Sequence, residues 1–373
     1  MKGFRLGSVI GFDIRIDFSW FIIFALILWS FSVGVFPAQL PGRSPTVYAV
    51  MGFAGAMLFF VSLLLHELSH SVVARAKGIP VEGITLFLFG GVARTRSEAG
   101  SPGDEFQIAF VGPLMSFALG AVFFGIAHVT AGAGWPEVAT IATYLSWLNV
   151  ILALFNLLPG FPLDGGRVLR SAVWKFTGSL TRATRIASIG GQALAYLLVA
   201  LGLLQTFVGG VMGGLWLVLI GWFLRNAAVQ SYQQHLVHEA LADATARQTM
   251  TPAPETVSPD LTLEELTDRH FLRRRYVAFP VMEDDAPVGL ITLNQVKDVP
   301  REDWPLRRTR DVMTPIGEAI TVGPDEPLLR VLDKLRASPG RRVLVVRDNQ
   351  LEGIITASDI AGWVARSREM PAS

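Results

Sequence analysis

The sequence predicts a polytopic α-helical membrane domain followed by a soluble α/β domain. Hydrophobic residues make up 51% of the 373 residues and charged residues only 17%, which is too apolar for an ordinary soluble enzyme. The long apolar runs lie within residues 1–232, whereas residues 240–373 have the composition of a globular protein. The motif MTP occurs at both Met250 and Met313, so the second part contains an internal repeat.

Six apolar segments are long enough to cross a bilayer, which requires about 20 mostly apolar residues. They lie at residues 17–36, 49–74, 106–130, 139–158, 186–208 and 211–229. Lys and Arg gather before the first segment, between the second and third, and between the fourth and fifth, and Arg225 lies near the end of the sixth. Arg43 is the exception among the other loops. Because basic loops stay in the cytoplasm, this pattern predicts a multi-pass protein of the cytoplasmic membrane with both termini in the cytoplasm.

The second apolar segment contains HELSH at residues 66–70. On a helix, His66 and His70 share one face and lie one turn apart, so their imidazoles can hold one ion. Glu67 lies about 100° around the helix, near the ion but outside its coordination sphere. HExxH is the pattern of two zinc ligands and a general base. The alternative is a polar face packed against other spans, which the cost of buried ionisable groups disfavours.

A catalytic zinc ion needs a third protein ligand and an open position for water. The chain has no Cys, so the ligands must be His, Asp or Glu. Asp164 follows the fourth segment in NLLPGFPLDGGR, and ionised Asp164 and Glu67 would nearly neutralise Zn²⁺, which lowers the cost of burial. The alternative for Asp164 is a turn or helix cap, because Asp-Gly-Gly is also a turn signal.

The segment at residues 81–96 is too short to cross the membrane as a helix, is rich in β-branched and aromatic residues, and contains a Gly-Gly pair. We expect a membrane-inserted β-hairpin beside the HELSH site, where non-helical backbone is tolerated against protein or a wet cavity. An amphipathic loop at the membrane surface is the alternative.

These motifs, together with GPLMS at 112–116, resemble the site-2 protease family of intramembrane zinc metalloproteases. The resemblance is closest to the six-span subgroup with a C-terminal pair of CBS domains, and it covers nearly the whole chain. It implies that one zinc ion is bound by His66, His70 and Asp164, that Glu67 is the catalytic acid/base, and that Asn156 lies near the scissile peptide.

Span three carries two further positions of interest. The resemblance implies that Gly112 lets this span approach the site closely. Ser116 stands where the family often has Asn, at the last position of GPxxN, and no role is assigned to it here.

A membrane-spanning substrate helix must unwind before its peptide bonds become accessible. An edge strand can capture the unwound segment by strand addition, and the family resemblance points the same way. The expected substrate-binding residues in the hairpin are Thr85, Leu86, Phe87, Leu88 and Phe89. The expected substrate is a membrane-anchored protein cleaved near the cytoplasmic face, as in regulated intramembrane proteolysis, such as an anti-sigma factor or a membrane-tethered transcription factor.

The soluble part is predicted to contain two β-α-β-β-α units, at residues 246–305 and 306–368, after a linker at 233–245 and before a tail at 369–373. Two such units bury a face on each other, because one alone has too little core.

The two units resemble a tandem CBS pair, of the type that often binds adenine nucleotides. The resemblance implies that Thr356 contacts phosphate and Asp359 the ribose. The first unit keeps Thr292 but has Gln295 in place of Asp, which leaves at most one ordinary nucleotide site. The alternative is a purely structural module, or one that forms a homodimer.

Two other classes of function remain open from the sequence. A catalytically inactive, membrane-bound nucleotide sensor would not need an intact HExxH motif and Asp164. A CBS-gated transporter would not need them either, and the six spans show no clear internal repeat. The net charge of +1 gives no indication of a nucleic-acid partner.

Overall fold

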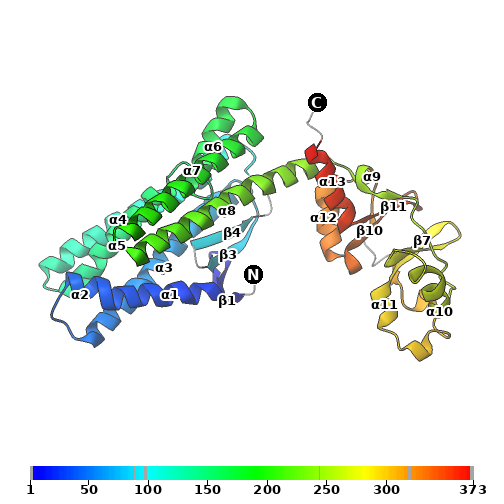
Figure 1. The fold of residues 1–373 in the computed structure, drawn as a ribbon, viewed down its shortest axis with the longest axis horizontal. Helices are drawn as coiled ribbons and strands as arrows, with labels where there is room; N and C mark the ends of the chain where they lie inside the picture. Colours follow the sequence, from blue (N-terminus) through cyan, green and yellow to red (C-terminus); the bar gives the residue numbers. More distant parts are fainter. Residues whose placement is uncertain (1–2, 88–89, 96–98, 243, 317–320, 370–373) are drawn as a thin grey trace. The chain divides into compact units, whose positions relative to one another are not determined.

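The computed structural model describes residues 3–87, 90–95, 99–242, 244–316 and 321–369. The chain divides into two compact units, Met1–Gln233 and Gln234–Ser373 (Figure 1). Each unit has its own core, and each is described separately.

The first unit is a bundle of long helices. Its helices are α1 (Phe18–Trp29), η1 (Ser30–Val35), α2 (Phe36–Gln39), α3 (Pro45–Ala76), α4 (Pro102–Gly132), α5 (Pro136–Asn156), α6 (Asp164–Thr177), α7 (Leu180–Phe207) and α8 (Val211–Ala242). Among the described residues, five helical segments are long and apolar enough to cross a membrane: 18–39, 45–76, 102–132, 136–156 and 180–207. They correspond to the first five expected spans, and the sixth falls within α8, which contains the boundary between the units.

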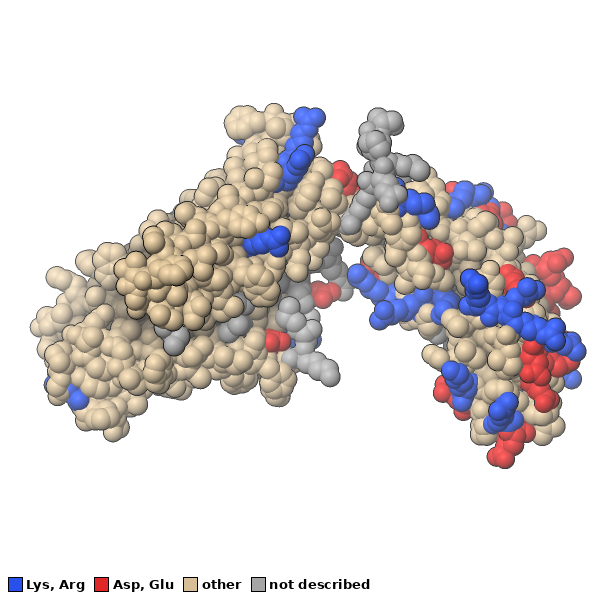
Figure 2. Space-filling model, viewed as in Figure 1, with Lys and Arg blue, Asp and Glu red and all other residues tan. Residues whose placement is uncertain are grey.

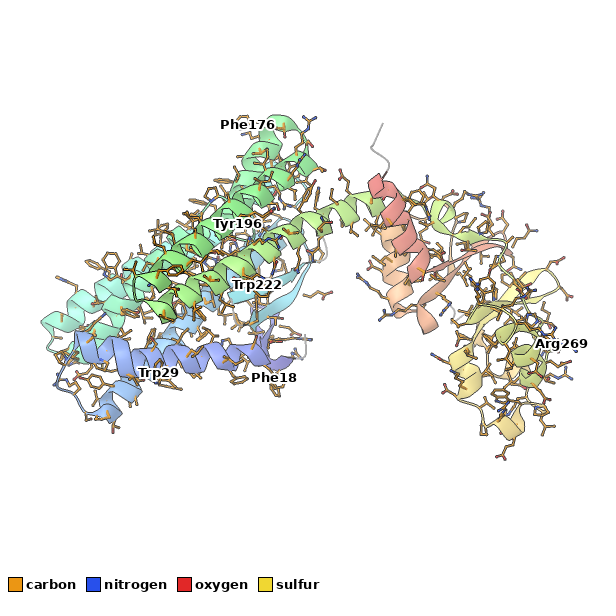
Figure 3. The ribbon with its side chains drawn as sticks, in the orientation of Figure 1. Phe18, Trp29, Phe176, Tyr196, Trp222 and Arg269 are labelled. Atoms are coloured by element: carbon orange, nitrogen blue, oxygen red, sulfur yellow. The ribbon has the colours of Figure 1, made fainter. Side chains whose placement is uncertain are left out.

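The surfaces of the two units differ as the sequence predicts. On the face shown, Lys, Arg, Asp and Glu are sparse over the first unit and dense over the second (Figure 2). In the first unit, large aromatic side chains such as Trp29, Tyr196 and Trp222 are more than half exposed (Figure 3). Apolar exposure on this scale is typical of helices that face lipid.

Local signals set where the long helices begin. Ser44 and Ser101 cap α3 and α4, with each hydroxyl accepting a hydrogen bond from a backbone N–H in the first turn. Each cap is followed by a proline at the first helical position, where the missing N–H costs nothing. The capped starts of α3 and α4 are therefore readable from the sequence.

A four-stranded sheet lies beside the bundle. Its strands are β1 (Gly3–Val9), β2 (Phe12–Asp17), β3 (Val81–Phe87) and β4 (Gly90–Thr95), in the order β1-β2-β3-β4. The pair β3–β4 is the expected hairpin. The strands β1 and β2 were not expected, although the alternation of buried Phe12, Ile14 and Ile16 with polar residues is a strand signal.

The strand order corrects the expected mode of edge pairing. Strand β3 pairs in parallel with β2 on one side and antiparallel with β4 on the other, so it has no free edge. Thr85 and Leu86, which were expected to bind substrate, are buried in β3. Leu88 and Phe89 lie outside the described residues. The free edge of the hairpin belongs to β4.

The second unit contains the expected repeat. The first half has α10 (Leu263–Leu266), β6 (Ala278–Glu283), β7 (Ala286–Thr292) and α11 (Leu293–Lys297). The second half has β9 (Thr321–Val322), α12 (Leu328–Ala337), β10 (Arg342–Arg347), β11 (Gln350–Thr356) and α13 (Ala357–Glu369). Ala278, Leu290 and Leu344 form a small core that joins the two halves.

Short strands connect the halves of the second unit crosswise. Strand β5 (Thr251–Pro252) precedes the first half but pairs with β11 of the second. Strand β8 (Thr314–Pro315) precedes the second half but pairs with β7 of the first. Each sheet is thus completed by the segment that precedes the other half, which ties the pair into one folding unit.

Candidate metal centre

Helix α3 places the two histidines of HELSH side by side. The Nε2 atoms of His66 and His70 are 3.2 Å apart, and both side chains are buried. This is the arrangement that the i, i+4 spacing predicts, with both imidazoles on one helical face.

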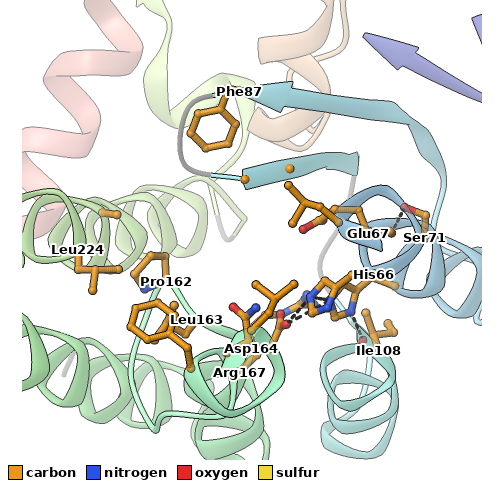
Figure 4. Close-up of a pocket in the computed structure, with 18 of the residues that line it drawn as sticks. His66, Glu67, Ser71, Phe87, Ile108, Pro162, Leu163, Asp164, Arg167 and Leu224 are labelled. Atoms are coloured by element: carbon orange, nitrogen blue, oxygen red, sulfur yellow. Dashed lines mark hydrogen bonds and ion pairs between the residues drawn. The ribbon is translucent and has the colours of Figure 1, made fainter. Parts of the chain in front are cut away.

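Asp164 completes a group of three. It is the first residue of α6, and its Oδ2 lies 3.1 Å from His66 Nε2 and 3.2 Å from His70 Nε2 (Figure 4). The three candidate ligand atoms lie within 4.8 Å of one another. Two imidazole nitrogens and a carboxylate oxygen form the donor set of many catalytic zinc sites, so these residues fit a zinc ion.

The surroundings of Asp164 favour its ionised form, which is the form that binds a cation. Burial opposes its ionisation, but the neighbouring charge of His70 and hydrogen bonds from both imidazoles together lower the pKa of Asp164 below its usual range. The carboxylate is therefore ionised at neutral pH.

The other ring nitrogen of each histidine is held by helix α4. His70 Nδ1 donates to the backbone carbonyl of Ile108 at 2.5 Å, and His66 Nδ1 lies 2.9 Å from Ser116 Oγ. Contacts of this kind fix the ring orientation and leave Nε2 free as a ligand. The roles of Ser116 and of the Ile108 carbonyl depend on the packing of α4 on α3, so neither could be predicted from the sequence alone.

Gly112 allows that packing. A methyl group on this residue would lie 2.1 Å from His70 Nε2 and 2.7 Å from His66 Nε2. Any side chain would therefore occupy the space of the imidazoles. The close approach that the family resemblance implied for Gly112 is present, and the helix contact falls directly at the ligand atoms.

Glu67 lies apart from the three ligands, at the contact between α3 and the sheet. A methyl group on Gly91 of β4 would be 2.4 Å from Glu67 Cγ, so the strand backbone runs directly over this side chain (Figure 4). Glu67 is not a member of the ligand group, as expected from its position on the helix.

These residues share one cavity of about 680 Å³. His66, Glu67, His70 and Asp164 line it, and so does Asn156 at the end of α5. Of the expected hairpin contacts, Phe87 lines it as well. The volume is in the range of typical ligand sites, about 300–1,000 Å³.

The candidate nucleotide residues form local hydrogen bonds in the second unit. Asp359 Oδ2 accepts from the backbone N–H and hydroxyl of Thr356, and Asp359 Oδ1 accepts from Thr251. At the equivalent place in the first half, Gln295 Oε1 accepts from the backbone N–H and hydroxyl of Thr292. Both pairs act as helix caps, so the geometry alone is compatible with a structural role.

Comparisons with known proteins identify the family. The model for peptidase family M50 matches residues 54–143 and 133–201, and the CBS domain model matches residues 246–302 and 310–366. Rip3 of Mycobacterium tuberculosis is 37% identical over 359 residues, which cover 95% of this chain and 91% of Rip3. The chain belongs to peptidase family M50. It is a zinc metalloendopeptidase of the site-2 protease type, with several membrane-spanning helices and a C-terminal CBS pair.

Other relatives of this M50 peptidase include zinc metalloprotease MJ0392 of Methanocaldococcus jannaschii. It is 31% identical over 362 residues, which cover 95% of this chain and 94% of MJ0392. A solved structure of the site-2 protease from Methanocaldococcus jannaschii matches with 29% sequence identity and a TM-score of 0.43, covering 62% of this chain and 95% of that chain.

Proposed function

We propose that this M50 peptidase cleaves membrane-anchored proteins near the cytoplasmic face of the cell membrane. Its zinc ion would be held by His66, His70 and Asp164, and Glu67 would be the general acid/base. The observation that carries this proposal is the convergence of three ligand atoms within 4.8 Å, inside a cavity that Glu67 also lines.

The metal ligands, Glu67 and Asn156 would each have a distinct part in peptide hydrolysis. A bound zinc ion would supply an acidified water molecule and polarise the substrate carbonyl. The Glu67 carboxylate accepts the proton from the attacking water and later returns it to the leaving amine. The Asn156 amide, with both a donor and an acceptor, orients the peptide group beside the ligands.

Removal of the metal tests the proposal directly. We expect the protein purified in detergent to cleave a membrane-anchored model substrate, to lose this activity in a strong chelator, and to regain it on addition of one equivalent of Zn²⁺. Addition of Mg²⁺ serves as the control, because a site of two imidazoles and one carboxylate disfavours it. Full activity in the chelator at equilibrium would refute the proposal.

The cellular orientation rests on the distribution of basic residues. Lys77 lies at the C-terminal end of α3 and Arg167 and Arg170 lie in α6, at the same end of the helices as the candidate metal centre. Because basic flanks stay in the cytoplasm, the centre would open toward the cytoplasmic side, with both termini on that side.

The substrate would be captured on β4. This strand is the edge of the sheet on the side of the hairpin, and its Gly91 packs against Glu67. A substrate segment that adds to β4 as a fifth strand would be extended, with its peptide groups accessible beside the general base.

Proline substitutions on β4 test this mode of capture. In an edge strand, alternate N–H groups point away from the neighbouring strand. Val92 and Ala93 are consecutive, so one of the two variants Val92→Pro and Ala93→Pro removes an N–H group that a substrate strand would use. Since one backbone hydrogen bond contributes about 0.5–1.5 kcal/mol, we expect cleavage to fall about two- to tenfold with zinc content unchanged. Ser8→Pro on the opposite edge strand β1 is the control. Unchanged cleavage in both β4 variants would exclude pairing on this edge.

The CBS pair would bind one adenine nucleotide and adjust the activity of the protease. Support comes from the asymmetry between the halves. Asp359 Oδ1 accepts one hydrogen bond, from Thr251, and has a second lone pair to offer, whereas the amide of Gln295 already donates to the carbonyl of Val312 and to Thr314. A ribose hydroxyl donates readily to a carboxylate, so the second half is the better site.

Titration calorimetry of the full chain with ATP, ADP and AMP tests this proposal. We expect at most one nucleotide per chain, with binding weakened at least tenfold in Asp359→Asn and unchanged in Gln295→Asn. The absence of heat with all three nucleotides would favour a purely structural module.

A further inference from the structure

Helix α6 carries the candidate ligand Asp164 but begins without a side-chain cap. Its first turn is held by close packing, because a methyl group on Gly165 or Gly166 would lie within 2.4 Å of the backbone of the preceding loop. That packing anchors the start of α6 to its own loop. It does not fix how α6 is turned toward α3, the helix that carries both histidines.

A buried ion pair provides that connection. The Arg170 guanidinium in α6 donates to Glu105 Oε1 through Nε at 2.5 Å and also contacts it through Nη2. Glu105 has no solvent-exposed surface, Arg170 is only 9% exposed, and the guanidinium lies over the Phe161 ring. Arg167 Nε lies 4.0 Å from the same oxygen, and Glu105 Oε2 accepts no hydrogen bond from the residues described, so the contacts of this carboxylate with α6 converge on Oε1.

Both partners lie on the helical faces that form the metal centre. In α4, Glu105 is three residues before Ile108, whose carbonyl holds His70, and seven before Gly112, which contacts both imidazoles. In α6, Arg170 lies six residues after Asp164, and both line the same cavity. The ion pair therefore joins the helix that orients the histidines to the helix that supplies the carboxylate.

Physical chemistry argues for positioning rather than stability as the role of this pair. Burying two charges costs much of what their attraction returns, and apolar residues of similar volume often stabilise a fold equally well. The planar guanidinium adds directionality, because two of its N–H groups must face one carboxylate. A directional contact limits rotation of α6 about its axis, and that rotation would displace Asp164 from the imidazoles.

We propose that Glu105 and Arg170 are positioning residues that hold α6 in the orientation in which Asp164 binds zinc. The inference rests on the zinc site proposed above. Neither residue touches the ligand atoms, and each acts through the helix that it fixes.

The test measures zinc affinity and folding separately. For the full chain in detergent, the zinc dissociation constant is obtained by competition with a chromophoric chelator, and the melting temperature is measured without metal. Glu105→Gln and Arg170→Lys should weaken zinc binding about 10- to 100-fold, the usual effect of losing an outer contact at a metal site. Lys175→Gln, an exposed change in the last turn of α6, is the control and should alter neither quantity.

A double variant separates positioning from folding. In each single variant, one charged side chain stays buried with a weaker partner, and this lowers the melting temperature. Glu105→Leu combined with Arg170→Leu removes both charges, so it should restore the melting temperature of the metal-free chain but not the zinc affinity. Wild-type zinc affinity in this double variant would overturn the inference. If the proposed zinc site itself is wrong, the result differs. The wild-type chain then binds zinc, and Asp164→Ala binds it equally well.

Discussion

Glu67→Gln is expected to keep one zinc ion per chain and to lose cleavage by at least two orders of magnitude. The amide has nearly the same shape as the carboxylate, so the contact with Gly91 and the ligand group should persist. It cannot accept a proton from water, and loss of a general acid/base typically costs about 10²–10⁴ in rate. Cleavage of a membrane-anchored substrate and metal content by elemental analysis measure the two quantities.

The control for this variant is Glu137→Gln, which changes a glutamate in the first turn of α5 that pairs with Arg43. It should cleave at the wild-type rate. Cleavage by Glu67→Gln within tenfold of wild type would exclude Glu67 as the acid/base. Loss of zinc in the same variant would show instead that Glu67 contributes to the ligand set.

Asp164→Ala and His70→Ala should each reduce bound zinc from one ion per chain to less than a tenth under mild chelation. Each change removes one of three protein ligands, and two remaining ligands hold zinc poorly in competition with a chelator. Asp164→Asn, which keeps the shape but not the charge, should fall between Ala and wild type. Elemental analysis after gel filtration in chelator provides the measurement.

The matched control for Asp164→Ala is Asp260→Ala, an exposed aspartate in the second unit that pairs with Arg308 and Arg310. It should retain all of its zinc. Full zinc content in Asp164→Ala would mean that the third ligand comes from another residue. If the wild-type chain binds about one zinc ion and both ligand variants lose it, the metal site is established, and the next question is the identity of the substrate.

Local patterns in the sequence predicted much of the fold and the site. The spacing of His66 and His70 determines that both imidazoles share a helical face, since 3.6 residues make one turn. Apolar length predicted the long helices, although α3 and α4 begin at Pro45 and Pro102, before the expected spans at residues 49–74 and 106–130, because a serine cap precedes each proline. The position of Asp164 just after the fourth span of a domain that also contains HELSH, together with the family resemblance, favoured it as the third ligand over a turn or helix cap, and the structure places it 3.1 Å from His66.

Contacts between distant segments were not predictable in the same way. Strands β1 and β2 were not predicted from the sequence. Neither was the strand order, which places β3 inside the sheet and makes β4 the edge strand of the hairpin. Nothing in the sequence connected Ser116 to His66 or Glu105 to Arg170.

The difference has a physical reason: some features depend on one segment of the chain, and others depend on contacts between segments. Helical spacing, caps and apolar length describe the geometry of a single segment, so the sequence by itself determined the spans, the histidine pair and the candidate carboxylate. Which strand forms an edge, which helix face meets which, and which polar groups are paired when buried depend on how segments far apart in the chain pack together. Only the tertiary structure decided those features, because they are properties of two surfaces in contact.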